Sequence, residues 1–512
     1  MPNSDNKQLA INMFSQALVF VVNFGISFFL TPYIVKKLGV DAYGFIGLST
    51  NILSYFQLAT VALNSMAGRF VTIEYHKGNI DKANKYFSSV FYANLFMGIV
   101  MATMLSVLLV YLELVIEIPD SLLGDVKLLF ALQSLSSVLA LIFNVYNVSP
   151  FIKNRLEIAS IRTLFSNIIR ALVLVALFGL FSAHLWYMGI SILLCNIYLI
   201  VANYKIKNRL TPELLIRKND YNFLYVKELC VSGVWNLVSK LGDILQRGMD
   251  LLFANIFISA TAMGILSITT NVPFIILHLL GNFTSAFAPS ITREYAIGDT
   301  DAIVNNLSKS IRILSCVIMI PLTILYVYGD VFYQLWVPSQ DAELLQKLTI
   351  VGTFALIVTS PLEGFWNVFT ATNKIKGSSI FVIINSILVF VTVVVCLLTT
   401  QNTITQMFII AGTRSVWGVL RGIFFLPIYG AYCMGQKWNF YYKFIFKPLI
   451  GILISMMICF LIRFIYMPDS WITLIIGGLI VAAITSILAG YLIMTKNDRE
   501  YFMSKVVKKI HV

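Results

Sequence analysis

Apolar stretches long enough to cross a lipid bilayer recur along the whole chain, and this feature constrains the fold most. About 20 apolar residues in a helix cross a bilayer core. Such stretches occupy residues 10–35, 43–68, 87–112, 124–149, 160–182, 184–203, 229–257, 262–290, 308–329, 345–371, 377–399, 405–431, 444–466 and 471–494. The segments between them are too short for a separate soluble domain. The sequence therefore predicts an all-α integral membrane protein with about 14 transmembrane helices.

Composition excludes the soluble classes of protein. Hydrophobic residues make up 58% of the chain and charged residues only 12%, about half the charged share of a soluble domain. The net charge of +13 would fit a nucleic-acid partner, but the basic residues lie in short segments between apolar stretches. We therefore expect membrane lipids as partners and no nucleic acid. The first apolar stretch exceeds a signal-peptide core, so we expect it to stay in the protein.

The charges of the connecting segments predict the orientation. Lys and Arg concentrate on cytoplasmic loops of membrane proteins. With the N-terminus inside, the basic loop 205–228 and the tail with Lys505, Lys508 and Lys509 are cytoplasmic. The basic residues left outside are few: Lys36, Lys37, Lys127 and Lys347. We expect a multi-pass protein of the bacterial cytoplasmic (inner) membrane with both termini in the cytoplasm.

The chain repeats itself at an offset of 220 residues. The matching pairs are Ala42/Ala262, Gly44/Gly264, Thr50/Thr270, Asn51/Asn271, Thr72/Thr292, Glu74/Glu294, Tyr75/Tyr295, Gly78/Gly298 and Asp81/Asp301. Six helices separate the copies, so both run in the same direction, which is a parallel repeat. We expect an N-terminal lobe (1–204, helices 1–6), the basic loop 205–228, a related C-terminal lobe (229–436, helices 7–12), and helices 13–14 with a basic tail (437–512).

Ionisable side chains inside a membrane are costly and usually face a cavity or a partner. The seventh span carries four at steps of three, four and three, which places them on one helical stripe. They are Lys240, Asp243, Arg247 and Asp250. We interpret the stripe as a wall of a translocation cavity. A structural ladder of salt bridges within the helix is the alternative.

Other spans add more basic than acidic groups. Arg414 and Arg421 lie seven residues apart on one face of the twelfth span, and Arg170 lies in the fifth. One guanidinium group of arginine can bind two phosphate oxygens at once. These three arginines, together with Arg247 and Lys240, therefore indicate an anionic ligand. Asp243, Asp250 and Glu363 are candidates for binding a coupling ion. Asn51 and Asn271 line the cavity or join helices.

The sequence shows no pattern for a catalytic or metal centre. The four histidines are scattered over different segments, and the six cysteines lack metal-ligand spacing. No pair of a nucleophile and a base emerges. We therefore expect no enzyme activity, no metal and no cofactor. A membrane glycosyltransferase or polymerase of lipid-linked sugars, which would need catalytic residues in its outer loops, is the less favoured alternative.

The chain resembles the polysaccharide transporters of the multidrug/oligosaccharidyl-lipid/polysaccharide exporter superfamily, the flippases for lipid-linked O-antigen, capsule or teichoic-acid units. The residues that carry the resemblance are Asn12-Met13-Phe14, Phe29-Leu30-Thr31-Pro32, Leu38-Gly39-Val40-Asp41-Ala42-Tyr43-Gly44, Arg69, Glu74-Tyr75 and Gly78. Helix 1 carries Gln16 and Asn23, where the related lipid II flippases usually have arginines.

The resemblance implies a flippase for an undecaprenyl-diphosphate-linked oligosaccharide. The diphosphate would enter a cationic cavity by alternating access, driven by a proton or sodium gradient or by the membrane potential. A polysaccharide polymerase and glycosyltransferases are the implied partners. A drug or metabolite antiporter of the same superfamily is the alternative, although drug exporters favour an acidic interior and commonly lack helices 13 and 14.

Overall fold

A computed structural model describes residues 2–153, 155–285, 287–496 and 498–500, and this part of the chain is helical without any strand. Twelve of its helical segments are long and apolar enough to cross a membrane. The expected first and seventh spans, α1 (Pro2–Leu38) and α9 (Phe223–Arg247), are long helices outside these twelve. The charged residues of α9 lower its hydropathy. The basic tail with Lys505, Lys508 and Lys509 lies outside the described residues.

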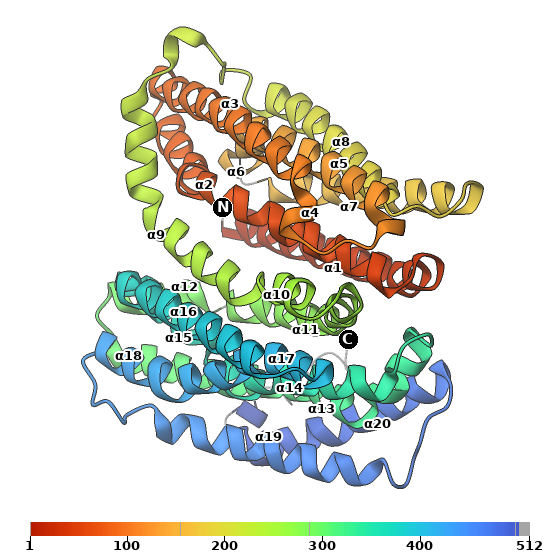
Figure 1. Ribbon diagram of the computed structural model, residues 1–512. Coiled ribbons are helices and arrows are strands. Elements are labelled where there is room, and N and C mark those ends of the chain that lie inside the picture. The colour runs from red at the N-terminus through yellow and green to blue at the C-terminus, as the bar shows by residue number, and fades with distance from the viewer. Residues whose placement is uncertain (1, 154, 286, 497, 501–512) are drawn as a thin grey trace. The chain divides into compact units, whose positions relative to one another are not determined.

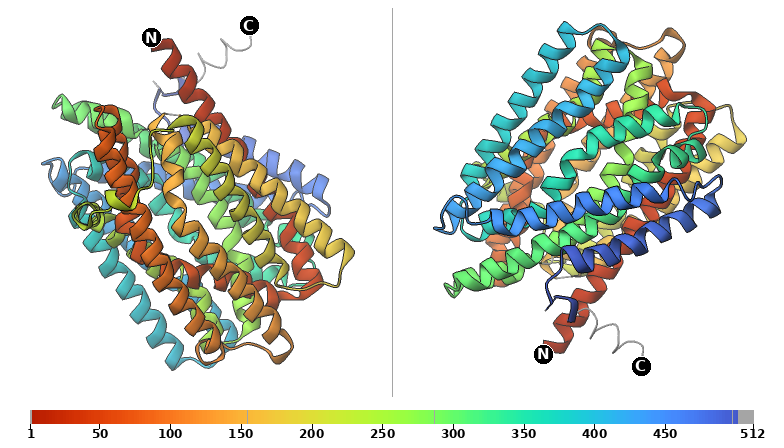
Figure 2. Two further views of the ribbon diagram at one scale, coloured as in Figure 1. Left: turned by 90° about the horizontal axis from the view of Figure 1, so that it is seen from above. Right: turned by 90° about the horizontal axis from the view of Figure 1, so that it is seen from below.

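Contacts between residues divide the chain into two compact units, Met1–Gly264 and Ile265–Val512. Within each unit the long helices lie side by side (Figure 1, Figure 2). The expected lobes were predicted from the repeat in the sequence, whereas the two units are defined by contacts between residues in the structure. The helices that open the second repeat in the sequence, α9 and α10 (Asp250–Phe257), therefore pack with the first unit. The expected lobe boundaries stay a prediction.

The first unit contains most of the short helices and helical breaks. Besides α1, α9 and α10, its elements are α2 (Val40–His76), α3 (Ile80–Val110), α4 (Leu112–Val115), η1 (Asp120–Leu122), α5 (Leu123–Ile142), η2 (Asn144–Asn147), α6 (Val148–Ile152), α7 (Leu156–Leu180), α8 (Tyr187–Leu210) and η3 (Lys218–Asp220). Its core between α2, α3 and α6 contains Leu63, Val71, Phe87 and Val90.

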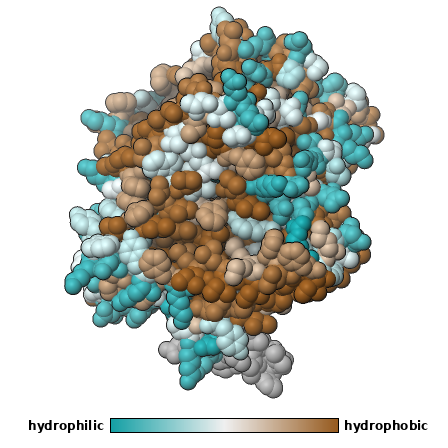
Figure 3. Space-filling model, turned by 60° about the horizontal axis from the view of Figure 1, so that its bottom comes forward, coloured by the Kyte–Doolittle hydropathy of each residue, from teal (hydrophilic) through white to brown (hydrophobic). Residues whose placement is uncertain are grey.

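The second unit begins inside α11 (Ala260–Ser285). Its further elements are α12 (Ala288–Ala296), α13 (Thr300–Trp336), α14 (Ala342–Thr359), η4 (Ser360–Glu363), α15 (Gly364–Ala371), α16 (Ile375–Thr399), α17 (Thr403–Leu420), the π-helical η5 (Arg421–Phe425), α18 (Leu426–Cys433), α19 (Tyr442–Ile462) and α20 (Trp471–Leu492). The long α13 provides core residues such as Leu314 and Ile318. Apolar side chains cover much of the face in Figure 3, as lipid contact requires.

The loop after the repeated motif has the same backbone in both copies. Gly78 has a φ of 79° and Gly298 a φ of 76°, in the left-handed region that glycine tolerates. In the first copy the amide of Asn79 donates to the carbonyl oxygen of Glu74 at 3.0 Å, and in the second Asp299 does the same to Glu294 at 3.0 Å. The polar matches of the repeat therefore specify a helix-ending turn.

Two of the expected spans are broken at related places. The span expected at 124–149 divides into α5, η2 and α6, and the span at 345–371 into α14, η4 and α15. In η4, Pro361 lacks an N–H for the helical ladder. In η2, the side chains of Asn144 and Asn147 donate to other asparagine side chains. Interrupted helices of this kind occur in transporters where the backbone lines a cavity.

The expected basic loop 205–228 is mostly ordered structure. Helix α8 runs on to Leu210, and residues 211–222 lie along α3. The Oδ1 atom of Asn84 accepts from the amide of Leu215 at 2.9 Å, and the Oγ atom of Ser88 accepts from the amide of Arg217 at 3.0 Å. These bonds fix the connection to the first unit.

Candidate functional site

The polar stripe predicted on the seventh span is divided between two helices. Helix α9 ends at Arg247, residues 248–249 interrupt it, and α10 begins at Asp250. Lys240 is exposed and Asp250 is buried. The side chains of Asp243 and Arg247 lie outside the described part of the structure. The four residues therefore do not share one continuous helix, contrary to the geometry assumed from their spacing.

Helix α9 packs closely on α2 (Figure 1). The hydroxyl group of Tyr55 donates to the carbonyl oxygen of Gly248 at 2.6 Å, which holds the break after α9 against α2. One turn before Lys240, the Nδ2 atom of Asn236 donates to the Oγ atom of Ser65 at 3.1 Å. Asn236, Ser65 and Lys240 are exposed, so both helices have exposed polar side chains around this hydrogen bond.

The asparagines matched by the repeat lie in separate units. Asn51 is half-buried on α2, and Asn271 is half-buried on α11. The Nδ2 atom of Asn271 donates within its own helix to the carbonyl oxygen of Ser267 at 3.2 Å. This bond does not distinguish between lining a cavity and joining helices, and both roles stay predictions.

The second unit holds three of the predicted residues, Arg414, Arg421 and Glu363. Arg414 lies on α17, Arg421 begins the π-helical turn η5, and Glu363 ends η4. All three are partly buried and take part in side-chain interactions. Both η4 and η5 pack on α14. Single π-helical turns inside α-helices are frequent at functional sites.

A pair of basic groups on α7 lacks counter-charges. Arg162 is only 6% exposed, its Nε atom donates to the carbonyl oxygen of Ile158 at 3.1 Å, and its buried Nη1 atom has no acceptor among the described residues. Arg170 is partly buried, and its buried Nε atom likewise has none. Neither forms an ion pair within the described structure. We call Arg162 and Arg170 the α7 arginines.

Further buried donors without an acceptor among the described residues lie on α7 itself and on α5. Ser166 lies between them at four-residue steps, so the three residues share one face of the helix. The buried Nδ2 atom of Asn167 on α7 and the buried Nε2 atom of Gln133 on α5 also have no acceptor in the described structure. Both helices pack on α8. The unsatisfied groups of α5 and α7 are thus all N–H donors, which suit an acceptor-rich, anionic ligand.

Sequence reasoning found Arg170 but missed Arg162. The fifth span was expected at 160–182, and Arg162 lies near the start of that range. In the structure α7 begins at Leu156, and the arginine lies about two helical turns from that end. The only sequence signal for the burial of Arg162 would have been a helix that begins about one turn before the expected span.

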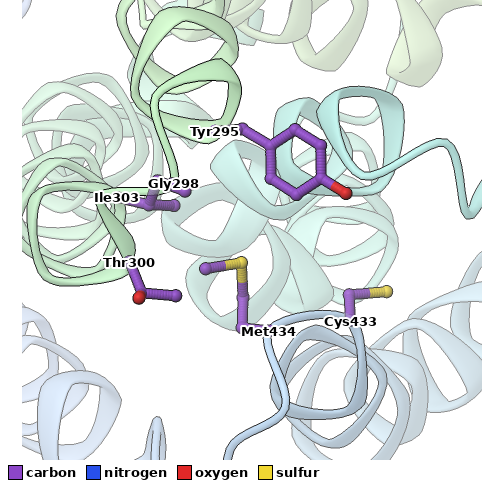
Figure 4. Close-up of a pocket in the computed structure, with 6 residues that line it drawn as sticks. All are labelled: Tyr295, Gly298, Thr300, Ile303, Cys433 and Met434. Atoms are coloured by element: carbon purple, nitrogen blue, oxygen red, sulfur yellow. The ribbon is translucent and has the colours of Figure 1, made fainter.

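A small cavity of about 150 Å³ opens at the end of α12 and α18 in the second unit. It is lined by Tyr295, Gly298, Thr300, Ile303, Cys433 and Met434 (Figure 4). None of the predicted site residues lines it, and its wall contains no charged side chain. It therefore does not suit a charged ligand. Among the described residues no group of His, Cys, Asp or Glu side chains could hold a metal ion.

Many apolar helices, interrupted spans and buried guanidinium groups define a multi-pass membrane transporter. Residues 37–340 match the family described as polysaccharide biosynthesis protein, and the chain belongs to this family. The family expected from the N-terminal motifs and the all-helical membrane class are thus confirmed. Family and fold are those of flippases and transporters.

Known relatives extend over nearly the whole chain. The uncharacterized membrane protein EpsK of Bacillus subtilis (strain 168) is 28% identical over 501 residues, which is 98% of each chain. The lipid II flippase MurJ in an inward closed conformation matches with a TM-score of 0.66 at 15% identity, over 94% of this chain and 99% of that chain. An inward-facing multidrug resistance transporter of the MATE family matches with a TM-score of 0.65 at 11% identity, over 84% and 97%.

Proposed function

We propose that this protein moves a polyprenyl-diphosphate-linked oligosaccharide from the cytoplasmic to the outer leaflet of the bacterial inner membrane. The observation that carries the proposal is the pair of α7 arginines, whose guanidinium groups are held in a membrane-spanning helix without a counter-charge in the described structure. A buried charge without a partner is strongly unfavourable. A transported anion would supply the missing charge.

A diphosphate fits the chemistry of these donors. Guanidinium groups donate to phosphate oxygens in a planar fork, and such charge-assisted bonds are stronger than neutral ones. Their strength increases where water is excluded. The family supports a polysaccharide precursor as cargo. Asp250 and Glu363 are the proposed groups for proton or sodium coupling, with Asp243.

The proposal is tested by replacing Arg162 and Arg170 singly by Ala and measuring transfer of a diphosphate-linked sugar lipid in proteoliposomes. We expect transfer to fall at least about tenfold, because a hydrogen bond to a charged group contributes about 1.5–3 kcal/mol and 1.4 kcal/mol is a factor of ten. Arg209→Ala, at an exposed position near the end of α8, is the matched control and should keep the parental rate.

The unfolding temperature separates a ligand-binding role from a structural one. Removing an uncompensated buried charge should leave the ligand-free protein as stable as the parent or more stable. Parental transfer rates in both variants would refute the proposal. Arg247→Ala, Arg414→Ala and Arg421→Ala belong in the same assay, and we expect each to lose transfer while remaining in the membrane.

A further inference from the structure

Four asparagines from three elements of the first unit form a chain of hydrogen bonds. The side chains of Asn64 on α2 and Asn94 on α3 bond each other twice, each Nδ2 donating to the other Oδ1 at 3.0 Å. The Nδ2 atom of Asn144 on η2 donates to the Oδ1 atom of Asn64 at 3.0 Å. The Nδ2 atom of Asn147 donates to the Oδ1 atom of Asn144 at 3.1 Å.

The chain runs from a buried end to an exposed end. Asn94 is fully buried, Asn64 and Asn144 are partly buried, and Asn147 is exposed. Asn64 also donates to the carbonyl oxygen of Thr60 at 3.1 Å, so both of its amide hydrogens and both lone pairs are used. Asn147 uses one amide hydrogen. Its other hydrogen and its carbonyl oxygen have no partner among the described residues, so they are open to a ligand.

The second unit does not repeat this chain of asparagines. At the offset of 220, the positions of Asn64, Asn94 and Asn144 hold Thr284, Leu314 and Gly364, and only Asn147 has an asparagine counterpart, Asn367. In the second unit the Nδ2 atom of Asn367 donates to the carbonyl oxygen of Thr284 at 3.0 Å. The chain of four asparagines is thus particular to the first unit.

The surroundings of Asn147 suit a neutral, hydroxyl-rich ligand. An amide presents a donor and an acceptor side by side, and a sugar hydroxyl both donates and accepts. One turn later on the same face, the exposed ring of Phe151 offers an apolar surface. Helix α6 ends five residues after Asn147, and Lys153 follows. Asn147 thus lies near the predicted inner surface, at the depth where the head of a lipid-linked sugar begins.

We infer that η2 forms a saccharide-binding subsite, in which Asn147, held in place through Asn144 by Asn64 and Asn94, contacts the first sugar of the substrate. The inference rests on the proposed function and divides recognition between two places. The α7 arginines bind the charged diphosphate, and the asparagine chain binds the uncharged sugar.

The test measures binding to the full-length protein in nanodiscs with two probes. One is a polyprenyl diphosphate that carries a single N-acetylhexosamine, and the other is the same polyprenyl diphosphate without sugar. We expect Asn147→Ala to weaken binding of the sugar-bearing lipid about three- to tenfold, the factor for one or two neutral hydrogen bonds. Binding of the sugar-free lipid should not change. Asn147→Ser, which keeps a hydroxyl group, should lose less.

Asn219→Ala, at an exposed position on η3, is the control and should bind both lipids like the parent. Equal affinity of Asn147→Ala and the parent for the sugar-bearing lipid would overturn the inference and leave the proposed function intact. Equal losses for both probes, with a lower unfolding temperature, would show a structural role and would also overturn it. A parent protein that binds neither probe would instead refute the proposed function.

Discussion

Gly233 lies at a close approach of α9 to α2. A Cβ atom at this position would stand 1.9 Å from the carbonyl oxygen of Ala62 and 2.7 Å from its carbonyl carbon. Backbone atoms cannot move aside as the end of a flexible side chain can. The residue therefore limits how closely α9 and α2 can approach each other.

At the residue scale we predict that Gly233→Ala destabilises the protein. Overpacking costs about 1–3 kcal/mol, which outweighs the gain of up to about 1 kcal/mol from the better helix propensity of alanine. The unfolding temperature in detergent should fall. Gly25→Ala is the control, because Gly25 is also inside a helix and a Cβ there would meet nothing within 4 Å. Equal unfolding temperatures of the two variants would contradict the prediction.

The structure changes the interpretation of Arg463. Its place near the outer end of the thirteenth span suggests a side chain that reaches to the membrane surface. In the structure its Nη1 atom donates to the Oδ1 atom of Asp330 at 2.9 Å, and its Nη2 atom donates to the other carboxylate oxygen. This paired arginine contrasts with the α7 arginines and has no free charge for a ligand.

At the scale of elements, the segment after α20 is tied to α13. The Nε atom of Arg312 donates to the Oδ2 atom of Asp498 at 2.7 Å, and the hydroxyl group of Thr495 donates to the same oxygen at 2.7 Å. Burial would raise the pKa of Asp498, but the hydrogen bonds from Arg312 and Thr495 and the charge of Arg312 hold it below its usual value. The folded protein therefore favours the ionised carboxylate.

The pH dependence of this tie follows from the lowered pKa. Its stabilisation is fully present above the ordinary pKa of an aspartate, about 3.9, and is lost as the pH falls through the lower pKa of the folded state. Asp498→Asn should lower the unfolding temperature at pH 7, since hydrogen bonds to charged groups contribute about 1.5–3 kcal/mol. The difference from the parent should shrink below about pH 4. Glu500→Gln, at an exposed carboxylate nearby, should show no such trend.

At the scale of the whole molecule, orientation and the number of passes remain predictions. The number of passes depends on α1 and α9, because both lie outside the twelve apolar spans. Three helical passes lie between residues 219 and 339 if α9 with α10 crosses the membrane, and two if it does not. Membrane-spanning helices with polar residues are tolerated where those residues face protein or water, so we expect three.

Single cysteines introduced as Asn219→Cys and Ser339→Cys in a variant without the six native cysteines test this topology. Both positions are exposed. A thiol reagent that cannot cross the membrane should label residue 339 from the outside and residue 219 only after the membrane is opened. Labelling of both positions from one side would show that α9 does not cross.

The sequence alone determined the class of the fold and the turns of the repeat. Stretches of about 20 apolar residues admit few structures in lipid other than helices, since every backbone group must be paired within the segment. The turns at Gly78 and Gly298 also depend on local sequence, because a left-handed backbone conformation excludes most residues other than glycine. Such properties depend on neighbours along the chain, so spacing and composition are enough to predict them.

Only the tertiary structure decided which polar groups have partners. The spacing of the seventh span predicted one stripe, but the chain breaks after Arg247 and divides it. Arg162, which the sequence analysis did not single out, is buried without a counter-charge among the described residues, whereas Arg463 pairs with Asp330, far away in the sequence. Asn64, Asn94 and Asn144 meet from separate helices. Hydrogen bonds and ion pairs require contact within a few ångströms, and packing rather than sequence spacing brings these groups that close.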